Sequence, residues 1–154
     1  MTRAAEMGKL AAFLRRHRRL GLDTNVFVYQ MEGHERFARA AGAVLAWVER
    51  EGHSAVASTI TMAELLVAPY RVGDEDKVNE FYATLTTFPH LQWVAPELMI
   101  ADGAARLRAR YKLTMPDALI AATAVVAGAT GLVTNDAGLL RVRELEVFVL
   151  DEAE

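Results

Sequence analysis

Short apolar segments alternate along this chain with stretches of helical periodicity, and few folds are compatible with that alternation. The apolar segments predict five strands, at residues 20–23, 55–58, 91–94, 131–134 and 147–150. Strands that alternate with helices are typical of βαβ units, in which the strands of one sheet run parallel. The sequence therefore predicts an α/β fold with a parallel sheet.

Helical spacing fills most of the sequence between these strands. Apolar side chains recur at helical intervals at Phe37, Ala41, Val44, Leu45 and Val48. Further helices are expected from Met62 to near Pro69, over residues 74–88 and over residues 97–111.

The helix expected between Pro116 and Gly128 is apolar on all sides and rich in alanine. A proline is favoured in the first turn of a helix, and a glycine commonly ends one. Because small side chains allow a close approach to the sheet, we expect this helix to lie at the centre of the fold.

The bulk composition restricts the class of protein. The chain has 154 residues, which is most simply one domain. Hydrophobic residues make up 53% and charged residues 24%, a globular composition that argues against disorder. The absence of cysteine excludes disulfides and zinc–thiolate sites and fits a reducing cytoplasm, which is the expected location. Apolar runs stay shorter than the roughly 18 residues of a membrane span, so no membrane partner is expected.

The net charge of −3 is unevenly distributed. Residues 1–20 hold six Lys/Arg and one Glu, whereas residues 21–154 hold eleven Lys/Arg and nineteen Asp/Glu. We interpret residues 1–19 as a basic, helical N-terminal extension with Leu10, Phe13 and Leu14 on one side. Its cationic cluster consists of Arg15, Arg16, Arg18 and Arg19. Such a cluster most commonly ends a solvated helix, and contact with RNA phosphates is the alternative.

Four acidic residues stand where an α/β fold would deliver their side chains into one cleft. Asp23 and Asp136 end expected strands, Glu64 lies in an expected helix, and Asp117 opens the alanine-rich helix. In open parallel sheets, ligands bind beyond the carboxyl ends of the strands, where the strand order reverses. We therefore expect these four carboxylates to converge.

Carboxylates grouped in this way need a proton or a cation. Two of them about 5 Å apart repel by roughly 3 kcal/mol at an effective dielectric constant of about 20. The site must then hold protons through raised pKa values or bind a metal ion. Oxygen ligands without histidine or cysteine favour Mg²⁺ or Mn²⁺, and water bound to such an ion could attack a phosphodiester.

Hydroxyl and amide side chains flank the acids at Thr24, Asn25, Thr134 and Asn135. They could hold the carboxylates, or a metal-bound water, by hydrogen bonds. The alternative is helix capping, because Asp, Asn and Thr are common N-caps at strand-to-helix turns. Asp117 has a similar alternative, since a carboxylate in a first helical turn is favoured by the helix dipole.

Four pieces of the sequence that contain these acids resemble the PIN-domain family, in particular the VapC-type toxins of bacterial toxin–antitoxin pairs. The pieces are Leu-Asp-Thr-Asn at 22–25, Thr-Met-Ala-Glu-Leu at 61–65, Pro-Asp-Ala-Leu-Ile-Ala-Ala-Thr-Ala at 116–124 and Val-Thr-Asn-Asp at 133–136. The third piece, which Arg-Ala-Arg-Tyr precedes at 108–111, is the most specific. The resemblance covers about residues 20–150, and the order and separation of the four acids agree with it.

The resemblance implies a single PIN-like nuclease domain over residues 20–154, with three α/β/α layers and a five-stranded parallel sheet in the order 3-2-1-4-5. It implies an endoribonuclease that needs Mg²⁺ or Mn²⁺, forms homodimers and is blocked by the tail of a partner antitoxin in the acidic cleft. Carried over by position, the metal-binding set would be Asp23, Glu64, Asp117 and Asp136, with Thr134 in support. Family members typically begin almost at the first strand, whereas residues 1–19 precede it here.

Two other functions are compatible with parts of this pattern. The Asp-Thr-Asn at 23–25 resembles the aspartyl-nucleophile loop of haloacid-dehalogenase phosphatases, but those enzymes need a second Asp where this chain has Asn25. The other is a PIN-like module that binds RNA or a protein without cutting. Manganese-dependent cleavage of RNA would distinguish the enzyme from the binding module.

The remaining polar and aromatic residues carry weaker signals. Four histidines have no metal-ligand spacing and are interpreted as structural: His17, His34, His53 and His90. Trp47 and Trp93 are expected in the core or at a subunit contact. Four basic residues are expected on solvated helix faces or along an RNA path: Arg71, Arg108, Arg110 and Lys112.

Overall fold

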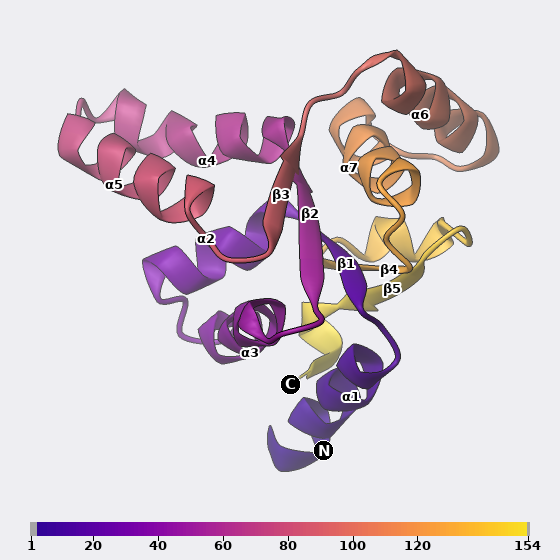
Figure 1. Cartoon of the computed structure of the whole chain (residues 1–154), viewed down its shortest axis with the longest axis horizontal. Coiled ribbons are helices and arrows are strands. Elements are labelled where there is room, and N and C mark those ends of the chain that lie inside the picture. The colour runs from indigo at the N-terminus through magenta and orange to yellow at the C-terminus, as the bar shows by residue number, and fades with distance from the viewer. Residues whose placement is uncertain (1–2, 154) are drawn as a thin grey trace.

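The computed structural model describes residues 3–153, which form a five-stranded sheet with helices on both faces (Figure 1). The strands are β1 (Arg19–Leu22), β2 (Ser54–Ser58), β3 (Leu91–Val94), β4 (Gly131–Thr134) and β5 (Glu146–Val149). All neighbouring strands pair in parallel, and their order is β3-β2-β1-β4-β5. The predicted fold class and strand order are therefore confirmed.

Helices connect the strands. They are α1 (Arg3–Arg15), α2 (Thr24–Glu32), α3 (Ala38–Glu49), α4 (Thr59–Arg71), α5 (Glu75–Thr86), α6 (Leu98–Arg110) and α7 (Met115–Val126). Two short 3-10 helices, η1 (Ala137–Arg141) and η2 (Leu150–Ala153), follow β4 and β5. Each strand ends within one residue of its predicted bounds, but α2 is not among the expected helices. It has nine residues, of which only Val26 and Phe27 are buried, so its periodicity is too short to detect.

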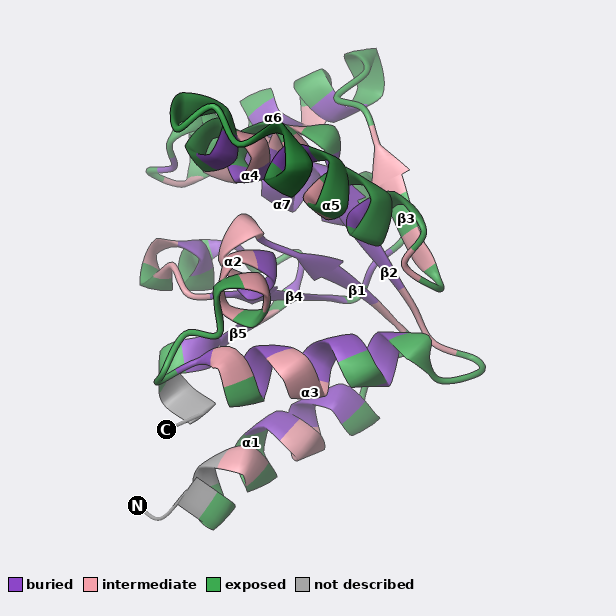
Figure 2. Ribbon diagram, turned by 90° about the vertical axis from the view of Figure 1, so that its left-hand side faces the viewer, coloured by how far each residue is buried: buried purple, intermediate pink, exposed green. Residues whose placement is uncertain are grey.

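Side chains that alternate along the strands supply two hydrophobic cores, one on each face of the sheet. Leu20 and Leu22 of β1 belong to the core beneath α1, α2 and α3, whereas Val56 of β2 belongs to the core beneath α6 and α7. Figure 2 shows β1, β2 and β4 largely buried between these helices and β3 half-buried, while the outer surfaces of most helices are exposed. Within residues 3–153, none of the helices is long and apolar enough to cross a membrane.

The alanine-rich helix α7 lies against β1, β2 and β4, which confirms its predicted central place. Gly21 of β1 makes this approach possible. A Cβ atom at Gly21 would lie only 2.6 Å from the Cβ of Ala124 in α7. The absence of a side chain at residue 21 therefore sets the distance between the sheet and α7, whose first turn carries Asp117.

Helix α1 packs on the same face of the sheet as α3 and also contacts η2 (Figure 1). Its Leu10, Phe13 and Leu14 are buried in the core, as their spacing predicts. The division of the chain into an extension over 1–19 and a domain over 20–154 stays a prediction. In the structure, one continuous core includes side chains from both segments.

Candidate functional site

All four predicted site acids lie on segments at the carboxyl edge of the sheet. Asp23 directly follows β1, Asp136 follows β4, and Glu64 lies in α4, which begins where β2 ends. Asp117 lies in the first turn of α7. Because the strands are parallel, their carboxyl ends meet at one edge, and the topology brings the four acids to it.

Local capping fixes the backbone at these positions. The Asp23 carboxylate caps α2 by accepting a hydrogen bond from the amide of Thr24, and the Asp136 carboxylate caps η1 at 2.8 Å from the amide of Gly138. The Thr114 hydroxyl caps α7 by accepting from the amide of Asp117 at 3.3 Å. The capping alternative is therefore correct for Asp23 and Asp136, and each also keeps carboxylate oxygens at the site edge.

Thr134 joins two of the acids. Its buried hydroxyl donates to Oδ2 of Asp23 at 2.7 Å and accepts from the amide of Asp136 at 3.0 Å. This one side chain therefore orients the first carboxylate and the backbone of the second. The sequence predicts Thr134 in support of the acids, and in the structure it contacts two of them.

Glu64 is tied to the β1 end of the site through Thr24. The Thr24 hydroxyl donates to Oε1 of Glu64 at 2.8 Å and lies 3.0 Å from the hydroxyl of Thr61. Thr24 thus contacts the carboxylates of both Asp23 and Glu64. Thr61 does not appear among the predicted site residues, because nothing in its sequence context separates it from an ordinary helix residue.

Asn25 and Asn135 hold the turn after β4 against α2. The Asn25 side-chain oxygen accepts from the amide of Asn135 at 3.1 Å, and the Asn135 amide group donates to the Tyr29 hydroxyl at 2.9 Å. Tyr29 is missing from the predicted site, and so is Thr114. The spacing Thr-x-x-Asp at 114–117 is a capping signal that could have identified Thr114.

The electrostatics of Asp117 indicate close carboxylates. The pKa of Asp117 is raised to about 7, first by burial and then by a hydrogen bond to Asp136 and by the charges of Asp136 and Asp23, while the hydrogen bond from Thr114 opposes the shift. Burial also raises the pKa of Asp23, as do the charges of Glu64 and Asp136, while hydrogen bonds from Thr134 and Thr24 oppose the shift. Each of the four acids therefore interacts with at least one other.

The carboxylates lack a protein counter-charge. Within the described part of the chain, none of the four forms an ion pair with a lysine, arginine or histidine. Oxygen donors with excess negative charge suit a hard dication such as Mg²⁺ or Mn²⁺. However, no three Asp, Glu or His side chains of residues 3–153 are grouped closely enough to hold a metal ion as they stand. The donor chemistry fits a metal, and closure around one would need side-chain movement.

The histidines and tryptophans lie in hydrogen bonds of their own. His17 Nδ1 lies 2.7 Å from the Thr130 hydroxyl, and His90 Nδ1 lies 2.9 Å from the Val48 carbonyl. Trp93 donates to the carbonyl of Leu85. These contacts agree with the structural interpretation of such residues.

Comparison with known proteins identifies a family for this chain. The family model described as PIN domain matches residues 21–145 of the chain. No curated protein matches the sequence.

Three solved structures are similar to this chain over most of their length. A chain from a toxin–antitoxin complex of Klebsiella pneumoniae is 25% identical with a TM-score of 0.64, and the match covers 86% of this chain and 97% of that one. A chain of VapBC2 from Rickettsia felis, bound to a promoter DNA fragment, is 20% identical with a TM-score of 0.69 and coverages of 85% and 98%. A chain of DNA-bound VapBC from Salmonella typhimurium is 18% identical with a TM-score of 0.60 and coverages of 86% and 98%. At their lower identities, the last two show the shared fold alone.

Proposed function

Because the chain belongs to the PIN-domain family, whose members are generally nucleases, we propose that it is a metal-dependent endoribonuclease and the toxin of a toxin–antitoxin pair. The observation that carries this proposal is the placement of four carboxylates at the carboxyl edge of the sheet, none of which pairs with a cation within the described part of the chain. A site that holds several carboxylates without a counter-charge is less stable than one that admits a cation.

Four side chains would hold the metal: Asp23, Glu64, Asp117 and Asp136. A bound Mg²⁺ or Mn²⁺ would supply an activated water for attack on an RNA phosphodiester and would neutralise charge that develops on the phosphate. Thr134 positions Asp23 through the hydrogen bond to Oδ2, and Thr24 positions Glu64 through its hydroxyl. These two threonines act on the ligands rather than on the substrate, so they are positioning residues.

Replacement of Asp117 by Asn tests the activity. The amide keeps the shape of the side chain but removes a charged ligand, so we expect Mn²⁺-dependent cleavage of single-stranded RNA to fall by at least about 100-fold. Cleavage is measured by the release of fragments from labelled RNA on a denaturing gel. Asp102→Asn is the matched control, because Asp102 is an exposed acid of α6 that pairs with Arg106. Undiminished cleavage by Asp117→Asn would overturn the assignment of the site.

The partner of the proposed toxin is a small antitoxin. The similar chain from Klebsiella pneumoniae comes from a toxin–antitoxin complex, which supports such a partner. We expect the antitoxin to place an Arg or Lys beside Asp117 and Asp136, where its charge would replace that of the metal. We also expect a homodimer located in the cytoplasm.

A module that binds RNA or a protein without cutting is the second candidate. One observation favours it: among the described residues, the acids do not group tightly enough for a metal. Manganese-dependent cleavage distinguishes the two functions. A binding module would bind RNA but leave it uncut at any concentration of Mn²⁺.

A further inference from the structure

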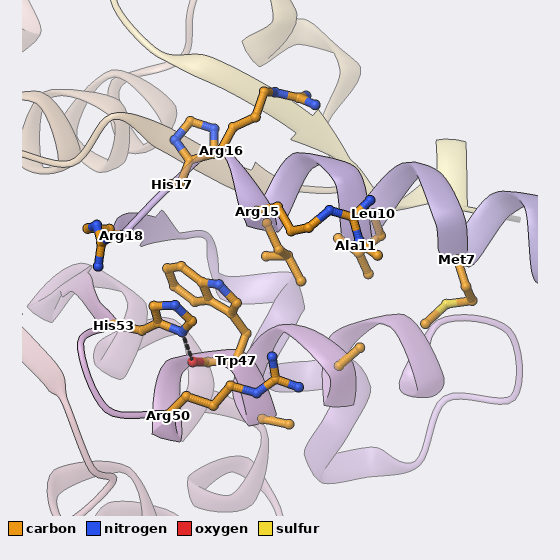
Figure 3. A pocket seen from close by; sticks show the side chains of 13 residues that line it. Met7, Leu10, Ala11, Arg15, Arg16, His17, Arg18, Trp47, Arg50 and His53 are labelled. Atoms are coloured by element: carbon orange, nitrogen blue, oxygen red, sulfur yellow. Dashed lines mark hydrogen bonds between the residues drawn. The ribbon is translucent and has the colours of Figure 1, made fainter.

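A hollow of about 690 Å³ lies between α1 and α3, away from the acidic site (Figure 3). Two of its lining residues, Arg18 and His53, immediately precede β1 and β2. Because all strands are parallel, the starts of β1 and β2 share one edge of the sheet, and the acids lie at the opposite edge. At about 3.3 Å per residue, β1 alone separates the two edges by roughly 13 Å. The hollow is therefore distinct from the acidic site.

Helix α1, which forms one wall of the hollow, is packed against the rest of the fold. Leu10 and Phe13 anchor α1 in the hydrophobic core, and α1 contacts both α3 and η2. Just after α1, Arg16 forms an ion pair with Glu146 of β5, and His17 contacts the hydroxyl of Thr130. The hollow thus belongs to the packed fold. The α1 wall also lies outside residues 21–145, which match the family model.

The exposed charged side chains that line the hollow are basic. Arg15, Arg18 and Arg50 are exposed, and within the range that the structure describes none of them pairs with an acid. The described lining contains no Asp or Glu. The large apolar side chains beneath, such as Leu14 and Trp47, are buried. The charged groups that a ligand would meet in this lining are therefore guanidinium groups, which favours an anion.

The half-buried ring of His53 stacks on the buried ring of Trp47. The rings of Trp47 and His53 lie 4.2 Å apart at an angle of 15°. His53 Nδ1 lies 2.8 Å from the Trp47 carbonyl, which can only accept, so Nδ1 donates and the ring is held in place. Figure 3 shows Arg18 and Arg50 on either side of this pair.

We propose that this hollow binds the phosphodiester backbone of RNA, as a second contact on the polymer that the acidic site would cut. The identity of the polyanion rests on the proposed function. Guanidinium groups bind phosphate with two parallel hydrogen bonds, and Arg15, Arg18 and Arg50 present three such groups around one opening. An acidic peptide is the competing occupant. RNA is favoured because it is the polyanion that the proposed function would bring to the protein, and because the charged side chains around the opening are all basic.

The test compares RNA affinity in two double variants. The first, Arg18→Gln/Arg50→Gln, removes two cations of the hollow. The second, Arg39→Gln/Arg106→Gln, removes two exposed cations outside its lining, one from α3 itself. Both are made in the Asp117→Asn background and titrated without divalent metal against a labelled 20-nucleotide oligouridylate, with fluorescence anisotropy as the readout. Backbone contacts are independent of base sequence, so this probe is sufficient.

Loss of two phosphate contacts should reduce the slope of log Kd against log salt by about 1.4 and weaken binding about 25-fold near 0.1 M salt. The control variant should stay within about twofold of its parent. An unchanged slope in the hollow variant would refute the inference. So would binding of a 20-residue polyglutamate that depends on Arg18 and Arg50 while RNA binding does not, because the hollow would then be a peptide site.

The two proposals fail in different ways. If the native chain cleaves RNA with Mn²⁺ but the Arg18→Gln/Arg50→Gln variant keeps its KM, the second contact is wrong and the nuclease stands. If RNA binding depends on the hollow but no cleavage occurs, the inference stands and the nuclease assignment is wrong. When both are correct, this variant in the native background raises KM and leaves kcat unchanged.

Discussion

The carboxylate of Asp23 illustrates how single residues prepare the acidic site. Its side chain is 5% exposed, and burial raises its pKa. The Thr134 hydroxyl and the Thr24 amide both donate to it, at 2.7 Å each, and these hydrogen bonds favour the charged form. These hydrogen bonds therefore limit the rise in the pKa of Asp23 that burial causes.

Replacement of Thr134 by Val should lower the free energy of unfolding, because it removes the hydroxyl that contacts Asp23 and Asp136. The variant keeps the shape of the side chain, but Asp23 loses a donor and the amide of Asp136 loses its acceptor. We expect the free energy of unfolding to fall by about 1–3 kcal/mol, as for other buried polar groups left unpaired. Urea unfolding of the metal-free protein measures the change. Thr134→Ser restores the hydroxyl and should recover most of the loss; equal stability of the Val and native proteins would contradict the role.

At the scale of elements, the position of α7 depends on a glycine in the strand beneath it. Gly21→Ala would place a Cβ atom 2.6 Å from the Cβ of Ala124 and 3.1 Å from Cδ1 of Leu132. Since α7 or the sheet must move, we expect a loss of about 1–3 kcal/mol in the free energy of unfolding. Gly8→Ala in α1 is the matched control, because its Cβ would meet nothing within 4 Å and alanine favours the helix. A Gly21→Ala protein as stable as native would show that α7 is not held so closely.

The strands, and the placement of the four acids at one edge of the sheet, could be predicted from the sequence. Both depend on local patterns and on one topological rule. Apolar runs mark the strands, and side chains that follow parallel strands collect at one edge of the sheet. Thr134 and Thr24 could be suspected for the same reason, since each neighbours an acid. Sequence patterns cannot predict how closely the four carboxylates approach one another, because those distances depend on side-chain rotamers.

Contacts between distant segments could not be predicted in the same way. The sequence presents Arg15, Arg16, Arg18 and Arg19 as one cationic cluster. In the fold, Arg16 pairs with Glu146, and Arg19 donates to the Ala127 carbonyl and to Gln92. In the hollow, the two arginines that remain lie with Arg50, which directly follows α3. A run of charges along the chain thus separates into structural and accessible groups only when the tertiary partners are known.

At the scale of the whole molecule, the parallel sheet separates charge between its two edges. The acids gather at the carboxyl edge, and the unpaired arginines of the hollow lie at the amino edge. The acidic edge should couple stability to pH and to metal. Because the pKa of Asp117 is about 7 in the fold and 3.8 in a model carboxyl group, the folded state retains a proton that the unfolded chain loses. The contribution of Asp117 to the free energy of unfolding therefore falls as pH rises from about 4 to 7.

Binding of Mn²⁺ should restore the free energy of unfolding at a pH where the carboxylates are ionised. At pH 8, a concentration 100 times the Kd should add about 2.7 kcal/mol to the free energy of unfolding, which raises the Tm of a chain of this size by roughly 5–10 °C. At pH 5.5, protons compete with the metal at Asp117, so the gain at the same concentration should be smaller. Thermal unfolding with and without Mn²⁺ at the two pH values measures both effects, with Asp102→Asn as the control that keeps them. Equal stabilisation of Asp117→Asn and native protein by Mn²⁺ at pH 8 would place the metal somewhere other than the acidic edge.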